Sequence, residues 1–290
     1  MPENKRRWGD RRDGRWIRDV DSLHVIMPYL YPNRADNEAY LQETYDLTEL
    51  NKYLAKKNEG RTQDKYTLMH AICTALVHTI TLRPKLNYFI KGHRIYERNH
   101  LSLAFVVKKQ FNDRGEEALA FMKFGPETTM DSLHEKIMKE IHTCRSEKVD
   151  HSTNAMNIIG KIPRWLLRPI FRILHSMDYH GTVPDALIGT DPNHATVMLS
   201  NFGSIGLSGG YHHLSNWGTM SIFVVIGKKR MAPVFKDDGS YEMREVVDIG
   251  ITLDERIADG YYYAKSLKIV RKLLEHPELL DTRADTEVEV

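Results

Sequence analysis

Two short segments carry the side chains that could do chemistry. The first is Asp254-Glu-Arg-Ile-Ala-Asp-Gly260, which we expect between a strand that ends near residue 253 and a helix that begins near residue 261. Its Glu255 is a candidate general base, because a positioned carboxylate can take a proton from a reacting group. The second is Leu199-Ser-Asn-Phe-Gly-Ser-Ile-Gly206, where the hydroxyl of Ser200 is a candidate hydrogen-bond donor to a developing oxyanion.

Each of these side chains also has a purely structural interpretation. Ser200 could bond to its own backbone in a turn. Glu255 could be a charged residue paired with Arg256 or another arginine. The reference pKa of glutamate is about 4.3 and that of histidine about 6.5, so a solvated glutamate is the poorer base near neutrality and burial would improve it. For Asp259 we expect a structural rather than a catalytic role.

The loop that follows Ser200 is rich in glycine and ends in two histidines. Its glycines lack the G-x-G-x-x-G spacing and the Lys-Ser/Thr of a phosphate loop, so turns and close packing explain them better. Histidine side chains in general titrate near neutrality, so His212 or His213 could supply an imidazole to a site that lacks one. Packing is the alternative. No carboxylate or cysteine lies at ligand spacing from this pair, so we expect no metal.

Helices and strands mingle along the chain, which indicates an α/β or α+β class with a mixed sheet. The segment 66–82 is apolar nearly all round and predicts a buried helix. Residues 24–32 contain two prolines and predict an irregular or edge strand. The remaining apolar patterns predict helices at about 46–59, 129–145 and 261–275, and strands at 87–90, 101–107, 118–123, 196–199, 222–227 and 246–253.

Taken in order, four motifs resemble those of one superfamily. The segment 254–260 resembles the D-H-R-x-x-D-G signature of the acyltransferase components of 2-oxo-acid dehydrogenase complexes, and 199–206 resembles their S-N-x-G-x-x-G loop. Tyr45-Asp-Leu-Thr48 is similar to their V-D-V-T junction, and Arg83-Pro-Lys-Leu-Asn87 to their P-x-L-N segment. The chain therefore looks like a member of the chloramphenicol acetyltransferase-like superfamily over roughly residues 20–280, closest to the dihydrolipoamide acyltransferase catalytic domain.

This resemblance implies a fold, an assembly and an activity. The fold would be a two-layer α/β sandwich of a mixed sheet with helices, built as a homotrimer with its sites between subunits. Coenzyme A would be a substrate, entering from one side, and a small acyl acceptor would enter from the other. Carried over by position, Ser200 would be the oxyanion donor, Asp259 would brace the loop, and Glu255 would stand where the family keeps its catalytic histidine. The substrate-binding positions would be Asn201, Gly203, His212 and His213.

The rest of the chain refines these expectations. We divide it into a basic arm at 1–20, the acyltransferase-like domain at 21–280 with an insertion at 151–190, and an acidic tail at 281–290. We expect no lipoyl domain before the fold, and hence no membership of a dehydrogenase complex. The net charge of +2, the two cysteines and the lack of an apolar span predict a cytoplasmic protein that does not bind nucleic acid, although the basic arm could touch phosphate groups.

One segment of the insertion has an amphipathic pattern. Residues 164–174 combine apolar side chains with Arg164, Arg168 and Arg172, so their basic face could contact a membrane surface. Pro169 weakens a continuous helix, and we favour a lid or an interface over a membrane contact. For the whole chain two functions stay open. One is an acyltransferase that uses Glu255 or a borrowed histidine as its base, and the other is a non-catalytic trimeric scaffold or binding module.

Overall fold

A six-stranded mixed sheet forms the centre of the computed structural model, which describes residues 7–108, 117–145, 160–189 and 191–289. The strand order is β2-β9-β8-β7-β5-β6, and β7 runs parallel to both of its neighbours while the other pairs are antiparallel. The strands are β2 (Glu38–Asp46), β5 (Leu101–Lys108), β6 (Glu117–Phe124), β7 (Val197–Asn201), β8 (Ile222–Phe235) and β9 (Tyr241–Asp254). The predicted mixed sheet is confirmed.

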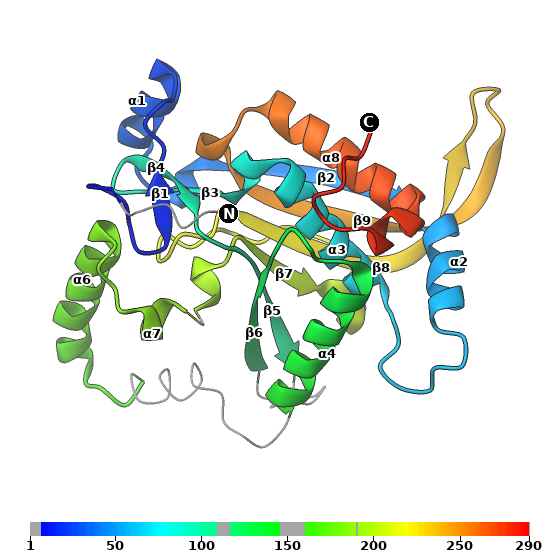
Figure 1. Cartoon of the computed structure of the whole chain (residues 1–290), viewed down its shortest axis with the longest axis horizontal. Helices are drawn as coiled ribbons and strands as arrows, with labels where there is room; N and C mark the ends of the chain where they lie inside the picture. The colour runs from blue at the N-terminus through cyan, green and yellow to red at the C-terminus, as the bar shows by residue number, and fades with distance from the viewer. Residues whose placement is uncertain (1–6, 109–116, 146–159, 190, 290) are drawn as a thin grey trace.

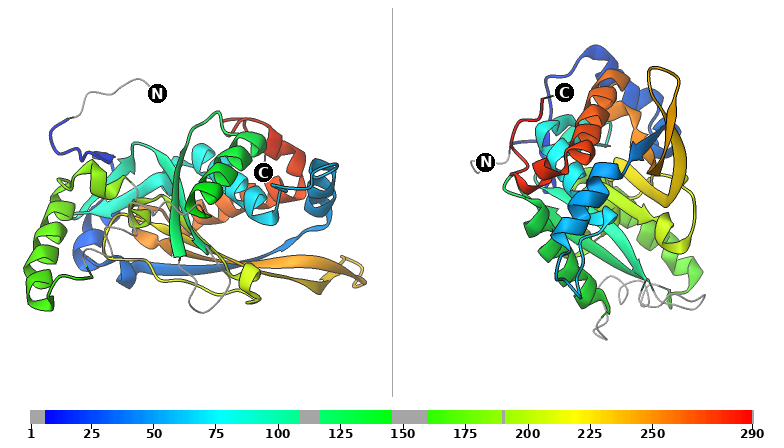
Figure 2. Two further views of the ribbon diagram at one scale, coloured as in Figure 1. Left: turned by 90° about the horizontal axis from the view of Figure 1, so that it is seen from below. Right: turned by 90° about the vertical axis from the view of Figure 1, so that its right-hand side faces the viewer.

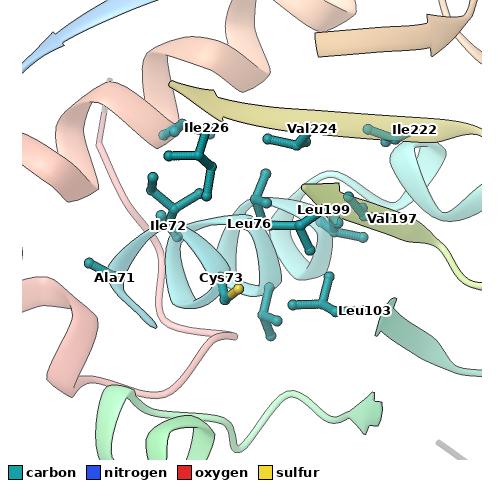
Figure 3. Close-up of a cluster of buried hydrophobic side chains, with 14 of the residues drawn as sticks. Ala71, Ile72, Cys73, Leu76, Leu103, Val197, Leu199, Ile222, Val224 and Ile226 are labelled. Atoms are coloured by element: carbon teal, nitrogen blue, oxygen red, sulfur yellow. The ribbon is translucent and has the colours of Figure 1, made fainter. Parts of the chain in front are cut away.

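Helices cover one face of this sheet (Figure 2, left). They are α2 (Thr48–Lys57), α3 (Leu68–Leu82), α4 (Met130–Arg145) and α8 (Gly260–Glu275). The central helix α3 is buried on almost every side, as its apolar sequence predicts. Figure 3 shows Ile72 and Leu76 of α3 against apolar side chains of β5, β7 and β8, so the two layers share one core.

The opposite face of the sheet carries a smaller apolar cluster. Phe223 and Val225 of β8 pack there against Leu214 and Met220 of the loop that joins β7 to β8, and Met198 of β7 packs against this cluster. Side chains alternate between the faces along a strand, so β7 sends Val197 and Leu199 into the main core. Ser200, like Met198, therefore points to this second face.

The basic arm is packed onto the fold, so the prediction of an unpacked segment is wrong for its described residues 7–20. Strand β1 (Gly14–Trp16) pairs with β4 (Arg94–Arg98), which pairs with β3 (Tyr88–Lys91), and the three form a second small sheet. Arg11 is only 5% exposed. A Cβ atom on Gly14 would lie 2.8 Å from the Glu97 carbonyl oxygen, so only glycine fits this close pairing. Arg15, whose charge suggested a solvated arm, forms an ion pair with Glu97 on the outside.

The segment after the arm is also different from the prediction. Residues predicted as an irregular strand form helix α1 (Ser22–Leu30), whose first turn is capped by Asp21 accepting a hydrogen bond from the His24 amide at 3.1 Å. Pro28 lies in the last turn of α1. Because proline has no amide hydrogen, one helical hydrogen bond is missing there, at a point where the helix is about to end.

The insertion contributes two helices, α6 (Arg164–His180) and α7 (Asp185–Ile188). Helix α6 continues through Pro169, so this proline does not interrupt it. Only Asp178 of its side chains is buried. Residues 151–159 and 190 of the predicted insertion lie outside the described residues.

Two more features of the structure extend beyond the elements predicted from the sequence. Strands β8 and β9 continue past the predicted ends and form a ribbon that projects beyond the sheet at one end of the molecule (Figure 1). The acidic tail begins on the body of the protein, since Ala284 is fully buried and the Asp285 amide donates to the Pro126 carbonyl at 3.2 Å. No helix among the described residues is long and apolar enough to cross a membrane.

Candidate functional site

Glu255 lies at the point where the chain leaves the sheet. Strand β9 ends at Asp254, a single 3-10 turn covers Glu255–Ile257, and α8 begins at Gly260. The Glu255 side chain is exposed, whereas Asp254, Arg256, Ile257 and Ala258 are all buried. The loop therefore directs one side chain outward and anchors itself through its neighbours.

The anchor is an ion pair between Asp254 and Arg256. The Arg256 guanidinium donates from Nε to Oδ1 at 2.8 Å and from Nη2 to Oδ2 at 2.7 Å, which is a bidentate pair. Its Nη1 donates to the Tyr31 and Pro32 carbonyls at 2.9 and 3.3 Å. Arg256 thus ties the loop to the segment after α1, and it pairs with Asp254 instead of Glu255, contrary to one alternative left open by the sequence.

Two further buried groups complete this anchor. Arg34 places Nε 3.5 Å from Oδ2 of Asp254. Burial lowers the pKa of Arg34 to about 10, and the charge of Asp254 opposes that shift. Tyr263 of α8 donates its hydroxyl to the Asp254 carbonyl at 2.9 Å, and burial raises its pKa well above the usual value.

Asp259 lies where the loop passes into the next helix. It is the N-cap of α8, and its carboxylate accepts a hydrogen bond from the Tyr262 amide at 2.8 Å. That bond lowers the pKa of Asp259. The contacts in the structure therefore assign it to the start of the helix, and any bracing of the loop by Asp259 stays a prediction.

Ser200 is the second-last residue of strand β7, just before a tight loop. Asn201 accepts a hydrogen bond from the Ser204 amide at 3.2 Å and so fixes the first turn of that loop. A Cβ atom on Gly203 would lie 2.6 Å from the Gly227 carbonyl oxygen, so the loop can approach β8 only with glycine there. In the part of the chain that the structure describes, neither the Ser200 hydroxyl nor the Glu255 carboxylate has a hydrogen bond or an ion pair.

The glycine-rich loop then runs across the second face of the sheet. A Cβ atom on Gly250 of β9 would lie 1.9 Å from the Gly210 carbonyl oxygen, which explains glycine at that strand position. His212 stacks on Phe223 of β8, with ring centroids 4.2 Å apart and planes 9° apart, and His213 stacks on His212. These contacts agree with the packing interpretation of the histidine pair.

The two candidate catalytic residues do not meet within one chain. Ser200 pairs with Val225, Val225 pairs with Gly250, and Glu255 lies five residues beyond Gly250 along β9. With about 3.3 Å per residue along a strand and about 4.8 Å between strands, their backbones are roughly 19 Å apart. Any site that uses both would need two copies of the chain.

A cavity of ≈ 280 Å³ lies behind the Glu255 loop. Cationic and amide side chains line it, among them Arg34, Lys91, Asn216 and Arg256. Lys91 donates to the Asn216 and Gly218 carbonyls at 3.2 and 3.1 Å and pairs with Asp178, so its charge is already compensated. Within the described ranges no cluster of three or more potential metal ligands occurs.

Sequence reasoning missed most of the residues that hold the Glu255 loop. Arg34 and Tyr263 lie far from the loop in sequence or in the following helix, and no local pattern marks them. Asp254 and Arg256 flank Glu255 in the sequence, but their spacing alone gives no reason to pair them with each other.

Comparison with known proteins is consistent with this geometry. The model of the 2-oxoacid dehydrogenases acyltransferase (catalytic domain) family matches residues 186–281, which include both Ser200 and Glu255. No curated protein sequence matches the chain.

Solved structures with the same fold cover nearly all of the chain. An Azotobacter vinelandii dihydrolipoamide acetyltransferase has a TM-score of 0.61 at 15% identity, covering 91% of this chain and 93% of its own. A probable dihydrolipoamide acetyltransferase from Listeria monocytogenes has 0.60 at 14%, covering 95% and 99%. A chloramphenicol acetyltransferase has 0.51 at 12%, covering 90% and 99%. The chain therefore has the chloramphenicol acetyltransferase-like fold, as its motifs predict.

Proposed function

We propose that this chain, which has the chloramphenicol acetyltransferase-like fold, transfers an acyl group from coenzyme A to a small thiol, hydroxyl or amine. The observation that carries the proposal is the pair of outward-facing side chains, Ser200 and Glu255, at the two positions where the motifs resemble those of acyltransferases. Both belong to the stretch that matches the acyltransferase catalytic domain. Both lack a structural partner among the described residues, which leaves them available to a substrate.

The separation of about 19 Å in one chain supports a site at a subunit boundary. We propose a homotrimer in which Ser200 of one protomer faces Glu255 of the next. A closed ring of heterologous contacts, in which one patch meets a different patch, repeats the same site three times. Light scattering tests this assembly, and a stable monomer would refute it.

The chemistry follows from the roles of the two side chains. Glu255 takes the proton of the acceptor as its sulfur, oxygen or nitrogen attacks the thioester carbonyl. The carbonyl oxygen becomes negative, and the Ser200 hydroxyl donates a hydrogen bond to it. Collapse of this intermediate breaks the carbon–sulfur bond, and the departing coenzyme A sulfur receives the proton from Glu255.

One solved relative supports these assignments. The study of the Azotobacter vinelandii enzyme concerns a serine, a histidine and an asparagine in its catalytic mechanism, and that histidine and asparagine are four residues apart. Glu255 and Asp259 have the same spacing. In this proposal, Glu255 has the place of the histidine, and Asp259 that of the asparagine.

Glutamate at this place also supports a second candidate function, a trimeric scaffold without catalysis. A solvated glutamate, with a reference pKa of about 4.3, is a weak base near neutral pH. A scaffold needs no general base, so a glutamate in place of the histidine would not impair its function.

Release of free coenzyme A thiol from a panel of acyl-coenzyme A species, with thiol, amine and hydroxyl acceptors, separates the two candidates. For the enzyme we expect Ser200→Ala to lower turnover about 10²–10³-fold, because one oxyanion donor is lost. Ser208→Ala, in the same loop, is the matched control and should retain full turnover. The absence of transfer with every acceptor, together with a melting temperature that millimolar coenzyme A does not change, would leave the scaffold.

A further inference from the structure

Helix α6 presents to solvent an arginine row and, on the far side of the helix, an apolar stripe. Arg164, Arg168 and Arg172 are four residues apart and so lie on one face of the helix. Leu166 and Ile173 lie seven apart on the side of the helix roughly opposite the arginine row, and Ile173 is 60% exposed. Trp165 in the first turn is 74% exposed. A helix of this kind has much apolar surface that the described protein does not cover.

The charge on this surface has one sign. From 164 to 177 the helix contains no aspartate or glutamate. Among the described residues, none of the three arginines forms an ion pair or a side-chain hydrogen bond. Other exposed arginines of the chain do have acidic partners, for example Arg271 with Glu43 and Arg283 with Asp285. The arginine row therefore lacks the partners that charged surface residues find elsewhere on the molecule.

Among the described residues, the ion pairs and ring contacts that join α6 to the body lie in its C-terminal half. The buried Asp178 pairs with Lys91 at 2.5 Å, and with Arg11 and His194 at 3.4 Å each. Burial alone would raise the pKa of Asp178, but the hydrogen bond from His194 and the charge of Lys91 outweigh it, and the pKa lies well below its usual value. This network ties the last turn of α6 to the body of the protein.

The position of α6 suits contact with a large flat surface. It lies at the end of the molecule opposite the β8–β9 ribbon, and both figures show it on the outside (Figures 1 and 2). Helix α1 lies at the same end and exposes Leu23, Ile26 and Tyr29. Tyr29 stacks on His93, which contacts Tyr179 of α6 edge-on, so an aromatic chain connects the two helices.

We propose that α6 binds the surface of an anionic lipid bilayer. An amphipathic helix with low overall hydrophobicity, arginines on its polar face and tryptophan and leucine on the other is typical of helices that lie in the membrane interface. Trp165, Leu166 and Ile173 enter the boundary between head groups and acyl chains, and the long arginine side chains extend to the lipid phosphates. The proline that argued against a continuous helix does not interrupt it.

A second copy of the chain is the competing occupant, and charge favours the membrane. A protein surface that covered this helix would have to bury Trp165 and Ile173 together with three arginines that have no acid between residues 164 and 177. A phospholipid surface supplies many phosphates at once and leaves the long arginine side chains hydrated.

The test is sedimentation of the full chain with vesicles of phosphatidylcholine alone and of phosphatidylcholine mixed with phosphatidylserine. We expect binding only to the mixed vesicles. The triple variant R164Q/R168Q/R172Q should bind about 10²-fold more weakly, because each arginine near an anionic surface contributes a factor of about five. The matched control is K265Q/K268Q/K272Q, which removes the same charge from α8 and should bind like the parent.

Two results concern the apolar stripe. Tryptophan emission should shift to shorter wavelength when mixed vesicles are added, and W165F should lose that shift. I173S should weaken vesicle binding without changing the oligomeric state. The proposal is overturned if the parent does not bind the mixed vesicles, if both triple variants lose binding equally, or if I173S dissociates an oligomer, since α6 would then be a subunit contact.

Discussion

Replacement of Asp254 by asparagine should release the loop that presents Glu255. The carboxylate of Asp254 is fully buried and accepts two charged hydrogen bonds from Arg256, while Arg34 lies 3.5 Å away. An asparagine of the same shape removes the only negative charge between two buried guanidinium groups. Breaking a buried ion pair from one side commonly costs about 3–5 kcal/mol.

The size of the thermal effect follows from the chain length. Unfolding entropy is about 2.1 cal/mol/K per residue, so a chain of 290 residues gains roughly 0.6 kcal/mol/K on unfolding. A loss of about 3–5 kcal/mol then lowers the Tm by roughly 5–8 °C. Acyl transfer should fall with it, because position 255 loses its fixed backbone. Differential scanning calorimetry and thiol release measure the two effects.

Asp259→Ala is the control, since the resemblance implies that Asp259 holds this loop. In the structure it only caps α8, so we expect a fall in Tm of no more than about 2 °C. If Asp259→Ala lowers the Tm as much as Asp254→Asn does, or if Asp254→Asn lowers it by less than Asp259→Ala, the assignment of the anchor to Asp254 is refuted.

Two further predictions concern histidine chemistry. If the glutamate is a lost base, Glu255→His should raise transfer from acetyl-coenzyme A to a simple thiol by up to about 10²–10⁴-fold, because an imidazole titrates closer to neutral pH. If Glu255 is itself the base, as proposed above, the same change should lower transfer to the native acceptor. Burial lowers the pKa of His70 and of His78 to about 4, and the charge of His134 adds to the effect on His70. Between pH 6.5 and 4 the unfolded chain therefore binds more protons than the folded one. The free energy of unfolding then falls as the pH falls. From pH 7.5 to 5 each histidine should cost about 2 kcal/mol; urea unfolding of His78→Leu should show about half the parent's loss, and an identical pH dependence would contradict this.

The elements that could be predicted are those whose burial shows in the local pattern. Helix α3 is apolar on all sides because it fills the space between the sheet and its neighbours α4 and α8. Helix α1 was mistaken for a strand because two prolines outweighed its short apolar turn. Strand β1 was missed because its pairing with β4 joins residues some eighty positions apart, and its charged neighbours face outward.

The candidate site was predictable in its exposed residues and not in its anchors. The positions of Ser200 and Glu255 come from motifs, and the structure places both at the ends of strands with free side chains. The choice of Asp254 as the partner of Arg256 depends on burial, which puts both below the surface and leaves Glu255 above it. Alternation along a short loop does not reveal which of three adjacent charged residues is buried.

The loop at residues 254–259 is held in place by residues other than Glu255, which explains how the fold can accept a glutamate at position 255. Among the described residues, the side-chain hydrogen bonds and ion pairs that hold residues 254–259 come from Arg34, Asp254, Arg256, Asp259 and Tyr263, and none comes from the Glu255 carboxylate. A change at position 255 therefore leaves the fold intact, so Glu255→His should leave the Tm within about 2 °C of the parent, in the range of surface substitutions. Any difference in transfer between glutamate and histidine must then arise from proton transfer itself. A large fall in Tm would instead show that the glutamate holds a contact in the assembled trimer, and that its role is structural.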